Sequence, residues 1–314
     1  MGYWRSCCSE KASIGVWRVK ISERVEARTH VPKDRLIPKP PIPTDAKIEL
    51  TNRCNLNCSF CATGSNGREK GDMSEKTMNV LLDAFMHLGV TDVGMFLLGE
   101  SLLRGDIVAH IKYAKRIGIP YVYLTTNGVL CTPSVFDQLK LAGLDSLKIS
   151  LNAADAVTYK KVTGKGMYET VIENIAYAAS QHGDMNFGVS CVYDEYHAEE
   201  LKALKKRTEP LCDFYFLPKY NQAGHVEAPV CGNVGTMRNP VEAMPCWELF
   251  NAMRFTWDGY MAVCAFPQAD DFKVGSIAER TIADLWHDEK MVNLREAHLR
   301  GDVHGTLCEK CIHG

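Results

Sequence analysis

The chain has 314 residues, of which 46% are apolar and 24% are charged, and its formal net charge is −2. This composition is typical of a soluble globular protein that forms one large domain or two ordinary ones. A charge so close to zero gives no reason to expect nucleic acid or an anionic membrane as the main partner. The sequence also lacks a run of about 18 apolar residues and the order of a signal peptide, so we expect a cytoplasmic protein.

The cysteine content is the first unusual feature. The chain carries 13 cysteines, an odd number, and seven of them fall into two groups with the spacing of metal ligands. In a reducing compartment such groups indicate metal binding more than disulfides. We therefore expect metal centres. The adjacent Cys7 and Cys8 could not easily face one cluster, and we interpret them as ordinary thiols.

Residues 1–45 are expected to form an N-terminal arm and a linker. Five prolines between Val31 and Pro43 exclude a regular helix from that stretch. The folded part of the chain should therefore begin near residue 46.

From Lys47 to about Leu217, short apolar runs alternate with helical patterns, which predicts repeated βα units and a parallel sheet. The expected strands are Ile48–Leu50, Val93–Leu98, Tyr121–Thr125, Leu147–Leu151, Phe187–Val192 and Phe214–Leu217. The expected helices are Glu75–Leu88, Ile107–Ile117, Ser134–Leu141, Tyr168–Ala179 and Ala198–Lys206. Six units are too few for a closed eight-stranded barrel. The predicted fold is therefore α/β, an open, partial (β/α)6 TIM-like barrel over residues 46–220.

Three cysteines follow the first expected strand at a C-x3-C-x2-C spacing, Cys54, Cys58 and Cys61. Three thiols so close on one loop can face one metal centre, and functional residues of a parallel barrel lie on loops after its strands. Iron-sulfur clusters and structural zinc usually take four protein ligands. A triad leaves one metal corner open, which suggests chemistry rather than scaffolding, although the spacing alone also fits a zinc loop.

The octet from Cys54 to Cys61, with Phe60 before its last cysteine, resembles the signature of the radical S-adenosylmethionine (SAM) superfamily. The resemblance implies that the three cysteines hold a [4Fe-4S] cluster and that SAM chelates the fourth iron. It also implies an open six-unit barrel as the core of the fold. Phe60 belongs to the segment that would border SAM.

Two further segments resemble SAM-binding motifs of this superfamily. Gly99 and Glu100 follow the second expected strand and are similar to the Gly-Gly-Glu motif that binds the amino group of SAM, with Leu98 and Ser101 departing from it. Ser150 and Asn152 share one face of the fourth strand and resemble the segment that contacts the ribose. A plain turn and a solvated edge strand are the respective alternatives. The segment Thr125-Thr126-Asn127-Gly128 at the end of the third strand also resembles the superfamily, but Asn-Gly after a strand is just as well a turn.

The C-terminal region, residues 221–314, carries the second group of cysteines, Cys246, Cys264, Cys308 and Cys311. A hairpin with an Asp258-Gly259 turn is expected between the first two, followed by helices near 282–287 and 292–299. Four cysteines with a C-x2-C pair alone favour a zinc ribbon. The whole arrangement, however, resembles the SPASM/twitch auxiliary-cluster domains that follow radical SAM barrels. The resemblance implies one auxiliary [4Fe-4S] cluster.

The resemblance also implies the reaction. A reduced cluster would cleave SAM to methionine and a 5'-deoxyadenosyl radical, which abstracts hydrogen from a C–H bond, with electrons from a flavodoxin or ferredoxin-type donor. We expect oxidation or epimerisation of a small sugar-like or aminocyclitol-like metabolite, because residues 1–45 lack the pattern of a leader-peptide recognition domain. Maturation of a ribosomally made precursor peptide is the alternative. Candidate groups for hydrogen or proton transfer are Cys231, His225, Glu227 and Arg254.

Overall fold

The computed structural model describes residues 19–64, 67–193, 198–219, 222, 224–226, 244–267 and 269–313. Its central element is a nine-stranded sheet with the strand order β6-β5-β4-β3-β2-β1-β7-β8-β9. The strands are β1 (Asp45–Ile48), β2 (Asp92–Gly94), β3 (Tyr121–Thr126), β4 (Ser146–Ser150), β5 (Asn186–Tyr193), β6 (Asp213–Pro218), β7 (Ala252–Phe255), β8 (Tyr260–Ala262) and β9 (Lys273–Ser276). All neighbours from β6 to β7 are parallel, and β8 and β9 are antiparallel.

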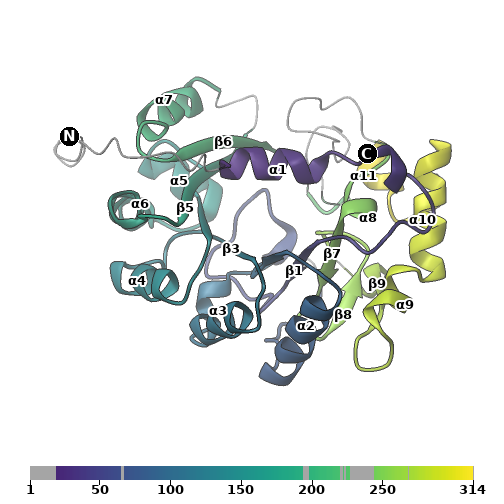
Figure 1. Cartoon of the computed structure of the whole chain (residues 1–314). Coiled ribbons are helices and arrows are strands. Elements are labelled where there is room, and N and C mark those ends of the chain that lie inside the picture. Colours follow the sequence, from purple (N-terminus) through teal and green to yellow (C-terminus); the bar gives the residue numbers. More distant parts are fainter. Residues whose placement is uncertain are drawn as a thin grey trace.

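Helices cover the outer face of the curved sheet, as Figure 1 shows for α2, α3, α4 and α6. The helices are α1 (Ile21–Thr29), α2 (Glu75–His87), α3 (Ile107–Arg116), α4 (Pro133–Leu141), α5 (Ala156–Thr163), α6 (Tyr168–Gln181), α7 (Ala198–Thr208), α8 (Glu248–Asn251), α9 (Ile282–Trp286), α10 (Glu289–Arg300) and α11 (Glu309–His313), with short 3-10 helices η1 (Lys33–Arg35), η2 (Ala62–Gly64), η3 (Ser101–Leu103) and η5 (Asp270–Phe272). None of the helices in this described part is both long and apolar enough to cross a membrane.

The predicted α/β fold with an open, partial barrel is confirmed. The apolar faces that predicted the units are buried: Leu81 and Phe85 of α2 and Phe136 of α4 pack with strand residues such as Val122 and Leu147 in one core. This burial is the main favourable contribution to the fold. Ser74 caps α2 through its side chain, which accepts from the amide of Thr77, as expected for a serine before a helix.

The second strand is shorter than predicted. β2 ends at Gly94, whereas the apolar run continues to Leu98. Beyond it the chain turns toward the cysteine loop, where the Glu100 amide donates to the Arg53 carbonyl over 2.8 Å. A contact with another loop therefore overrides the local strand propensity. The α5 helix was not predicted either, and it begins where Asp155 accepts from two backbone amides.

An N-terminal helix, α1, lies where the sequence predicted only an arm. It contacts β5, β6 and α8, and Figure 1 shows it running along β6 toward α8. Its polar contacts reach Asp45, Asp92 and Asp213, the first residues of β1, β2 and β6. The helix therefore closes the N-terminal end of the barrel.

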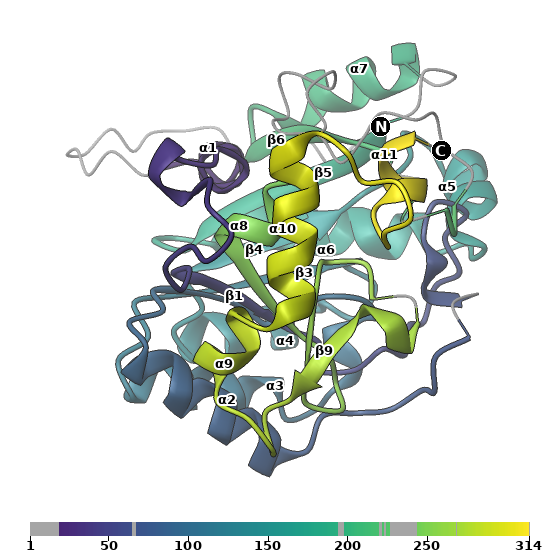
Figure 2. The ribbon, with the colours of Figure 1, turned by 90° about the vertical axis from the view of Figure 1, so that its right-hand side faces the viewer.

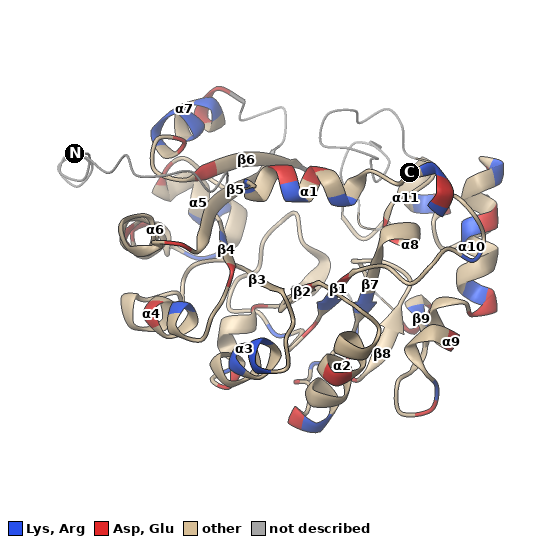
Figure 3. Cartoon of the chain, in the orientation of Figure 1, with Lys and Arg blue, Asp and Glu red and all other residues tan. Residues whose placement is uncertain are grey.

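The C-terminal strands continue the barrel sheet. β7 pairs in parallel with β1, with Asp45 opposite Ala252 and Ile48 opposite Phe255, and the predicted hairpin is formed by β7 and β8. Figure 2 shows α10 in front of α8, and these two helices are in contact. Basic and acidic residues are interspersed along α1 and α10 in Figure 3, whereas α7 begins with acidic residues and ends with basic ones. A division into units at 45 and 220 stays a prediction.

Candidate functional site

The cysteine triad lies on the loop that leaves the carboxyl end of β1. Cys54 is exposed, whereas Cys58 and Cys61 are partly buried. Backbone bonds anchor the loop to the end of α5: the amides of Asn57 and Ser59 donate to the carbonyls of Thr163 and Val162. The loop thus has a defined position at the barrel mouth.

A buried ion pair fixes the strand that leads into this loop. Glu49 is fully buried, and its two carboxylate oxygens accept from Arg68 over 3.0 and 2.8 Å. The Trp257 amide donates to the same carboxylate over 3.1 Å. Such a bidentate pair combines charge with fixed geometry. It links the cysteine loop, the segment after it and the turn between β7 and β8.

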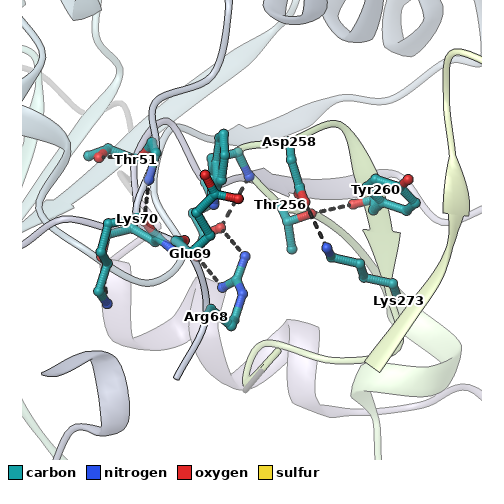
Figure 4. A network of polar contacts seen from close by, with 12 residues as sticks. Thr51, Arg68, Glu69, Lys70, Thr256, Asp258, Tyr260 and Lys273 are labelled. Carbon is teal, nitrogen blue, oxygen red and sulfur yellow. Dashed lines mark hydrogen bonds and ion pairs between the residues drawn. The ribbon is translucent and has the colours of Figure 1, made fainter. Parts of the chain in front are cut away.

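Figure 4 shows how the segment after the cysteine loop folds back onto it. Thr51 donates through its hydroxyl to the Gly71 carbonyl over 3.0 Å, and the Lys70 ammonium group bonds the Thr63 carbonyl. A side chain at position 71 would lie within 2.4 Å of the Trp257 ring. Glycine is therefore required there, so that the segment can pack against the C-terminal turn.

Gly99 provides the second close approach to the cysteine loop. Its φ is +80°, and an added Cβ would lie 2.3 Å from the Thr51 carbonyl oxygen. Glycine is the residue that satisfies both constraints. The structure therefore brings the predicted Gly99-Glu100 segment directly against the loop that carries the thiols.

Glu100 is almost completely buried, and its carboxylate joins the ends of two strands. One oxygen accepts from the Leu102 amide and the Thr126 hydroxyl, and the other accepts from the Asn127 amide. Burial raises the pKa of Glu100 although these hydrogen bonds lower it. Its contact with SAM stays a prediction.

Asn127 is a site residue that sequence reasoning left as a turn. Its side-chain amide donates to the Asn55 side chain over 2.7 Å and lies 3.9 Å from the Cys54 sulfur. The residues at the end of β3 therefore touch the cysteine loop. The Asn-Gly pattern after a strand was the available signal, and it could not separate this role from a turn.

The other predicted SAM contacts are only partly brought together. Phe60 and Asn152 line one small hollow with Ser59 and Val192, and the Asn152 side chain accepts from the Val192 amide over 2.9 Å. Ser150 is partly buried at the end of β4 and does not line that hollow. These assignments stay predictions.

Gln222 was not singled out from the sequence. Its side chain donates to the Phe60 carbonyl over 2.6 Å and accepts from the Ala62 amide over 3.1 Å. It therefore ties the loop beyond β6 to both sides of Cys61. No sequence motif marks this residue.

Two thiols of the triad have raised pKa values in the free chain. Burial raises the pKa of Cys54, and burial together with the neighbouring cysteines raises that of Cys58 to about 12. Across the described residues, no three His, Cys, Asp or Glu side chains converge on one ion-sized position. A four-iron cluster binds each thiolate at a different iron, so its ligands need not surround a single ion. The donor set therefore fits a cluster, which would also favour the thiolates.

The second group of cysteines is also gathered at one place. Cys246 is buried, and Cys264, Cys308 and Cys311 are partly buried. Burial raises the pKa of Cys246 and Cys264, and the charges of Cys308 and Cys311 raise both further. Residues more than 40 positions apart thus converge, and the Phe266 amide donates to the Cys264 sulfur over 3.4 Å.

A cavity of about 340 Å³ extends from the cysteine loop into the barrel. Phe60, Cys61 and Gln222 line one part of it, and Val25 and Arg28 of α1 line another. The space is therefore bounded by the triad and by the helix that closes the opposite end.

The four residues that the sequence suggested for hydrogen or proton transfer lie in different surroundings or outside the described residues. Cys231 and Glu227 lie outside the described residues, as do Cys7 and Cys8. His225 is exposed. Arg254 is fully buried between Asp45 and Glu248 in ion pairs of 3.1 and 2.9 Å, which assigns it to the join between β7 and β1.

A comparison with known protein families shows which superfamily the chain belongs to. Residues 48–207, half of the chain, match the Radical SAM superfamily. The chain belongs to the radical SAM superfamily. Residues 246–312 of this radical SAM protein match the iron-sulfur cluster-binding domain named SPASM. It is thus a radical SAM enzyme, whose superfamily uses a [4Fe-4S] cluster and SAM, and its SPASM domain implies auxiliary iron-sulfur chemistry.

Individual relatives differ in what their names describe. The chain is 25% identical over 295 residues to a probable GTP 3',8-cyclase of Sulfurisphaera tokodaii, covering 81% of this chain and 90% of the relative. BtrN in complex with AdoMet and 2-DOIA has a TM-score of 0.59 at 17% identity, covering 87% and 92%. Streptococcus suis SuiB bound to precursor peptide SuiA has a TM-score of 0.66 at 18% identity, covering 83% and 68%. The two structural likenesses show the fold.

Proposed function

We propose that Cys54, Cys58 and Cys61 hold the [4Fe-4S] cluster that binds SAM through its open iron. The observation that carries the proposal is a three-thiol loop fixed at the mouth of a cavity, with no fourth thiol beside it among the described residues. When bound, the cluster and SAM supply a 5'-deoxyadenosyl radical that abstracts a hydrogen atom. The protein orients the substrate and excludes water.

Phe60, Gly99, Glu100, Ser150 and Asn152 are the proposed SAM contacts. Gly99 supports this role because its close approach places Glu100 beside the cysteine loop. Asn127 joins them as a positioning residue, since it links Glu100 to Asn55.

Cys246, Cys264, Cys308 and Cys311 are proposed to bind one auxiliary [4Fe-4S] cluster. Four soft thiolate donors, with no histidine or carboxylate needed, suit iron-sulfur or zinc. The SPASM match favours iron. Such a cluster could accept the electron of a substrate radical, which would make the outcome an oxidation.

The proposed substrate is a small sugar-like or aminocyclitol-like metabolite, which is oxidised or epimerised. The cavity of about 340 Å³ is of the size that encloses a small molecule. The names of two relatives support a small molecule over a peptide: one is named for GTP, and the BtrN structure holds 2-DOIA. A cytoplasmic location and a flavodoxin or ferredoxin-type donor belong to the same proposal.

Modification of a precursor peptide is the second candidate. It is favoured by the likeness to SuiB, whose structure contains the peptide SuiA. A peptide would have to reach the cavity in an extended form past the loop that carries Phe60. Turnover of a short peptide, but of no free metabolite, would decide for this candidate.

Anaerobic iron and sulfide analysis of the reconstituted protein tests the proposal. Two four-iron clusters predict about eight irons and eight sulfides per chain. Added SAM should change the EPR spectrum of one reduced cluster and leave the other unchanged. Zinc in place of iron, or no deoxyadenosine under strong reductant, would contradict the proposal.

A further inference from the structure

The inner part of the cavity contains two lysines that lack an acidic partner. Lys47 on β1 and Lys148 on β4 both line it and are partly buried. Among the described residues, neither ammonium group has a carboxylate within ion-pair distance. Each ammonium group lies over an aromatic ring instead. Lys47 Nζ is 5.2 Å from the centre of the Phe96 ring, and Lys148 Nζ is 5.5 Å from the centre of the Tyr215 ring.

The acids nearest to these lysines are engaged in ion pairs with arginines. Of the charged side chains that line the cavity in the described part of the chain, Arg28, Lys47 and Lys148 are cationic and Glu248 alone is acidic. Glu248 is bound to Arg254 over 2.9 Å. Arg28 is paired with Asp45 and Asp92, the two acids at the ends of β1 and β2, and Arg24 shares Asp92. The excess positive charge therefore resides on the two lysines.

A glycine of the next strand lies opposite each of the two lysines. Lys47 lies opposite Gly94, and Lys148 lies opposite Gly188. A Cβ at Gly94 would lie 2.9 Å from the Lys47 side chain and 2.8 Å from the Tyr123 ring. A side chain at Gly94 would therefore compete with Lys47 for space, whereas one at Gly188 would meet Asp213 and Ile21.

Tyr215 adds an independent observation. Its side chain is 5% exposed and lines the same cavity, and its hydroxyl makes no hydrogen bond within the described part of the chain. Burial raises the pKa of Tyr215 far above its usual range, so the hydroxyl stays a donor. An unpaired buried hydroxyl is unfavourable unless a ligand accepts from it.

We propose that Lys47, Lys148 and Tyr215 bind an acidic group of the substrate, a phosphate or a carboxylate, in the inner part of the cavity. The proposal rests on the proposed function, because it names the chemical class of that substrate. Two cations and one hydroxyl donor without acceptors match an anion that offers several acceptor oxygens. The acidic end of the substrate would lie toward α1, and its reacting carbon toward Cys61 and Phe60.

The cost of this arrangement in the free protein supports the assignment. Burial and repulsion by Arg254 lower the pKa of Lys47 to about 7, although attraction to Glu248 and Asp45 opposes this shift. Burial and repulsion by Arg28 lower the pKa of Lys148 to about 8. Keeping uncompensated cations inside the barrel destabilises the free protein. A bound anion removes this cost.

Anion binding to the full chain, measured by calorimetry without oxygen, tests the proposal. Inorganic pyrophosphate and malonate serve as separate probes for phosphate and carboxylate, each with and without cluster reconstitution and SAM. The wild-type protein should bind one of them. Lys148→Met and Lys47→Met should each weaken that binding about 10-fold to 100-fold, and Tyr215→Phe about fivefold. Lys202→Met is the control, because Lys202 pairs with Glu199 on the exposed side of α7.

The stability of the same variants separates binding from folding. Lys148→Met and Tyr215→Phe remove uncompensated polar groups, so their Tm in the absence of anion should stay the same or rise. Failure of the wild-type protein to bind either probe would overturn the proposal, and so would equal binding by the lysine variants. Weaker binding with a lower Tm in both Lys148→Met and Tyr215→Phe would also overturn it. Anion binding does not require SAM cleavage, so it can fail while the proposed reaction holds.

Discussion

The two ends of the barrel use polar side chains in opposite ways. At the carboxyl end, the three thiols of the triad lie on an anchored loop, and Cys61 lines the cavity. At the N-terminal end, the acids that begin β1 and β2 are fully paired with Arg24, Arg28 and Arg254. The carboxyl end thus presents candidate ligands for a cluster, whereas the paired charges of the N-terminal end hold the fold together. This contrast can be tested by changing one residue at a time.

Loss of a thiol of the triad should have the largest effect. Cys58→Ala should abolish deoxyadenosine formation, because two thiolates cannot hold the cluster in place with one iron left for SAM. The assay is anaerobic incubation with SAM and dithionite. Cys212→Ala is the matched control, since Cys212 is a partly buried thiol outside both groups. Full SAM cleavage by Cys58→Ala would contradict the assignment of SAM chemistry to the triad at the carboxyl end.

The two buried acids should separate function from stability. Asp45→Asn leaves Arg28 and Arg254 without their shared carboxylate, and Glu49→Gln leaves Arg68 without its partner. Each should lower the free energy of unfolding in urea by about 3–5 kcal/mol. Glu49→Gln should also reduce the iron content, because Glu49 fixes the cysteine loop, while Asp45→Asn should retain it. Equal loss of iron in both variants would show that Glu49 has no specific role in fixing the cysteine loop.

The pH dependence of stability gives a finer test of Asp45. Burial alone would raise its pKa, but attraction to Arg28 and Arg254 outweighs burial and holds the pKa below the ordinary value of 3.8. A lowered pKa in the folded state contributes stability that is present above about pH 4 and is lost as the pH falls further. The difference in unfolding free energy between the wild type and Asp45→Asn should therefore shrink below about pH 4. If this difference in unfolding free energy stayed constant with pH, the charge of Asp45 would not be the source of its stabilising effect.

Gly99→Ala should have an intermediate effect. The positive φ and the contact with the Thr51 carbonyl predict a loss of about 1–3 kcal/mol, with a weaker EPR response of the cluster to SAM. Gly105→Ala is the control, since an added Cβ there meets no atom within 4 Å. An unchanged response would exclude Gly99 from the site.

The smallest effect is expected on the outer part of the N-terminal end. Arg24 is 32% exposed and shares Asp92 with Arg28, so Arg24→Gln should cost about 1 kcal/mol or less. Thermal unfolding measures the change. A loss as large as that of Asp45→Asn would show that α1 holds the barrel closed mainly through Arg24.

The sequence predicted the barrel because its apolar runs and helical patterns are regular and local. The spacing of the triad is a short-range feature that the sequence shows directly, whereas the second group was assembled through the family resemblance. The metal roles of both groups stay predictions. The α1 helix was missed, since its nine residues form a helix supported by acids that lie up to 191 positions away, such as Asp213. Asn127 and Gln222 could not be recognised either, because their roles depend on which loops meet. Lys47 and Lys148 carry no motif, and only the fold shows that they share a cavity.

The parallel pairing of β7 with β1 has a practical consequence for engineering. The strand that leads into the triad and the strand between Cys246 and Cys264 exchange backbone hydrogen bonds, and Arg254 bonds Asp45 across the same seam. The C-terminal segment is therefore not a detachable module. A chimera that takes residues 246–313 from a relative would also need that relative's first strand, or the seam would join two mismatched edges.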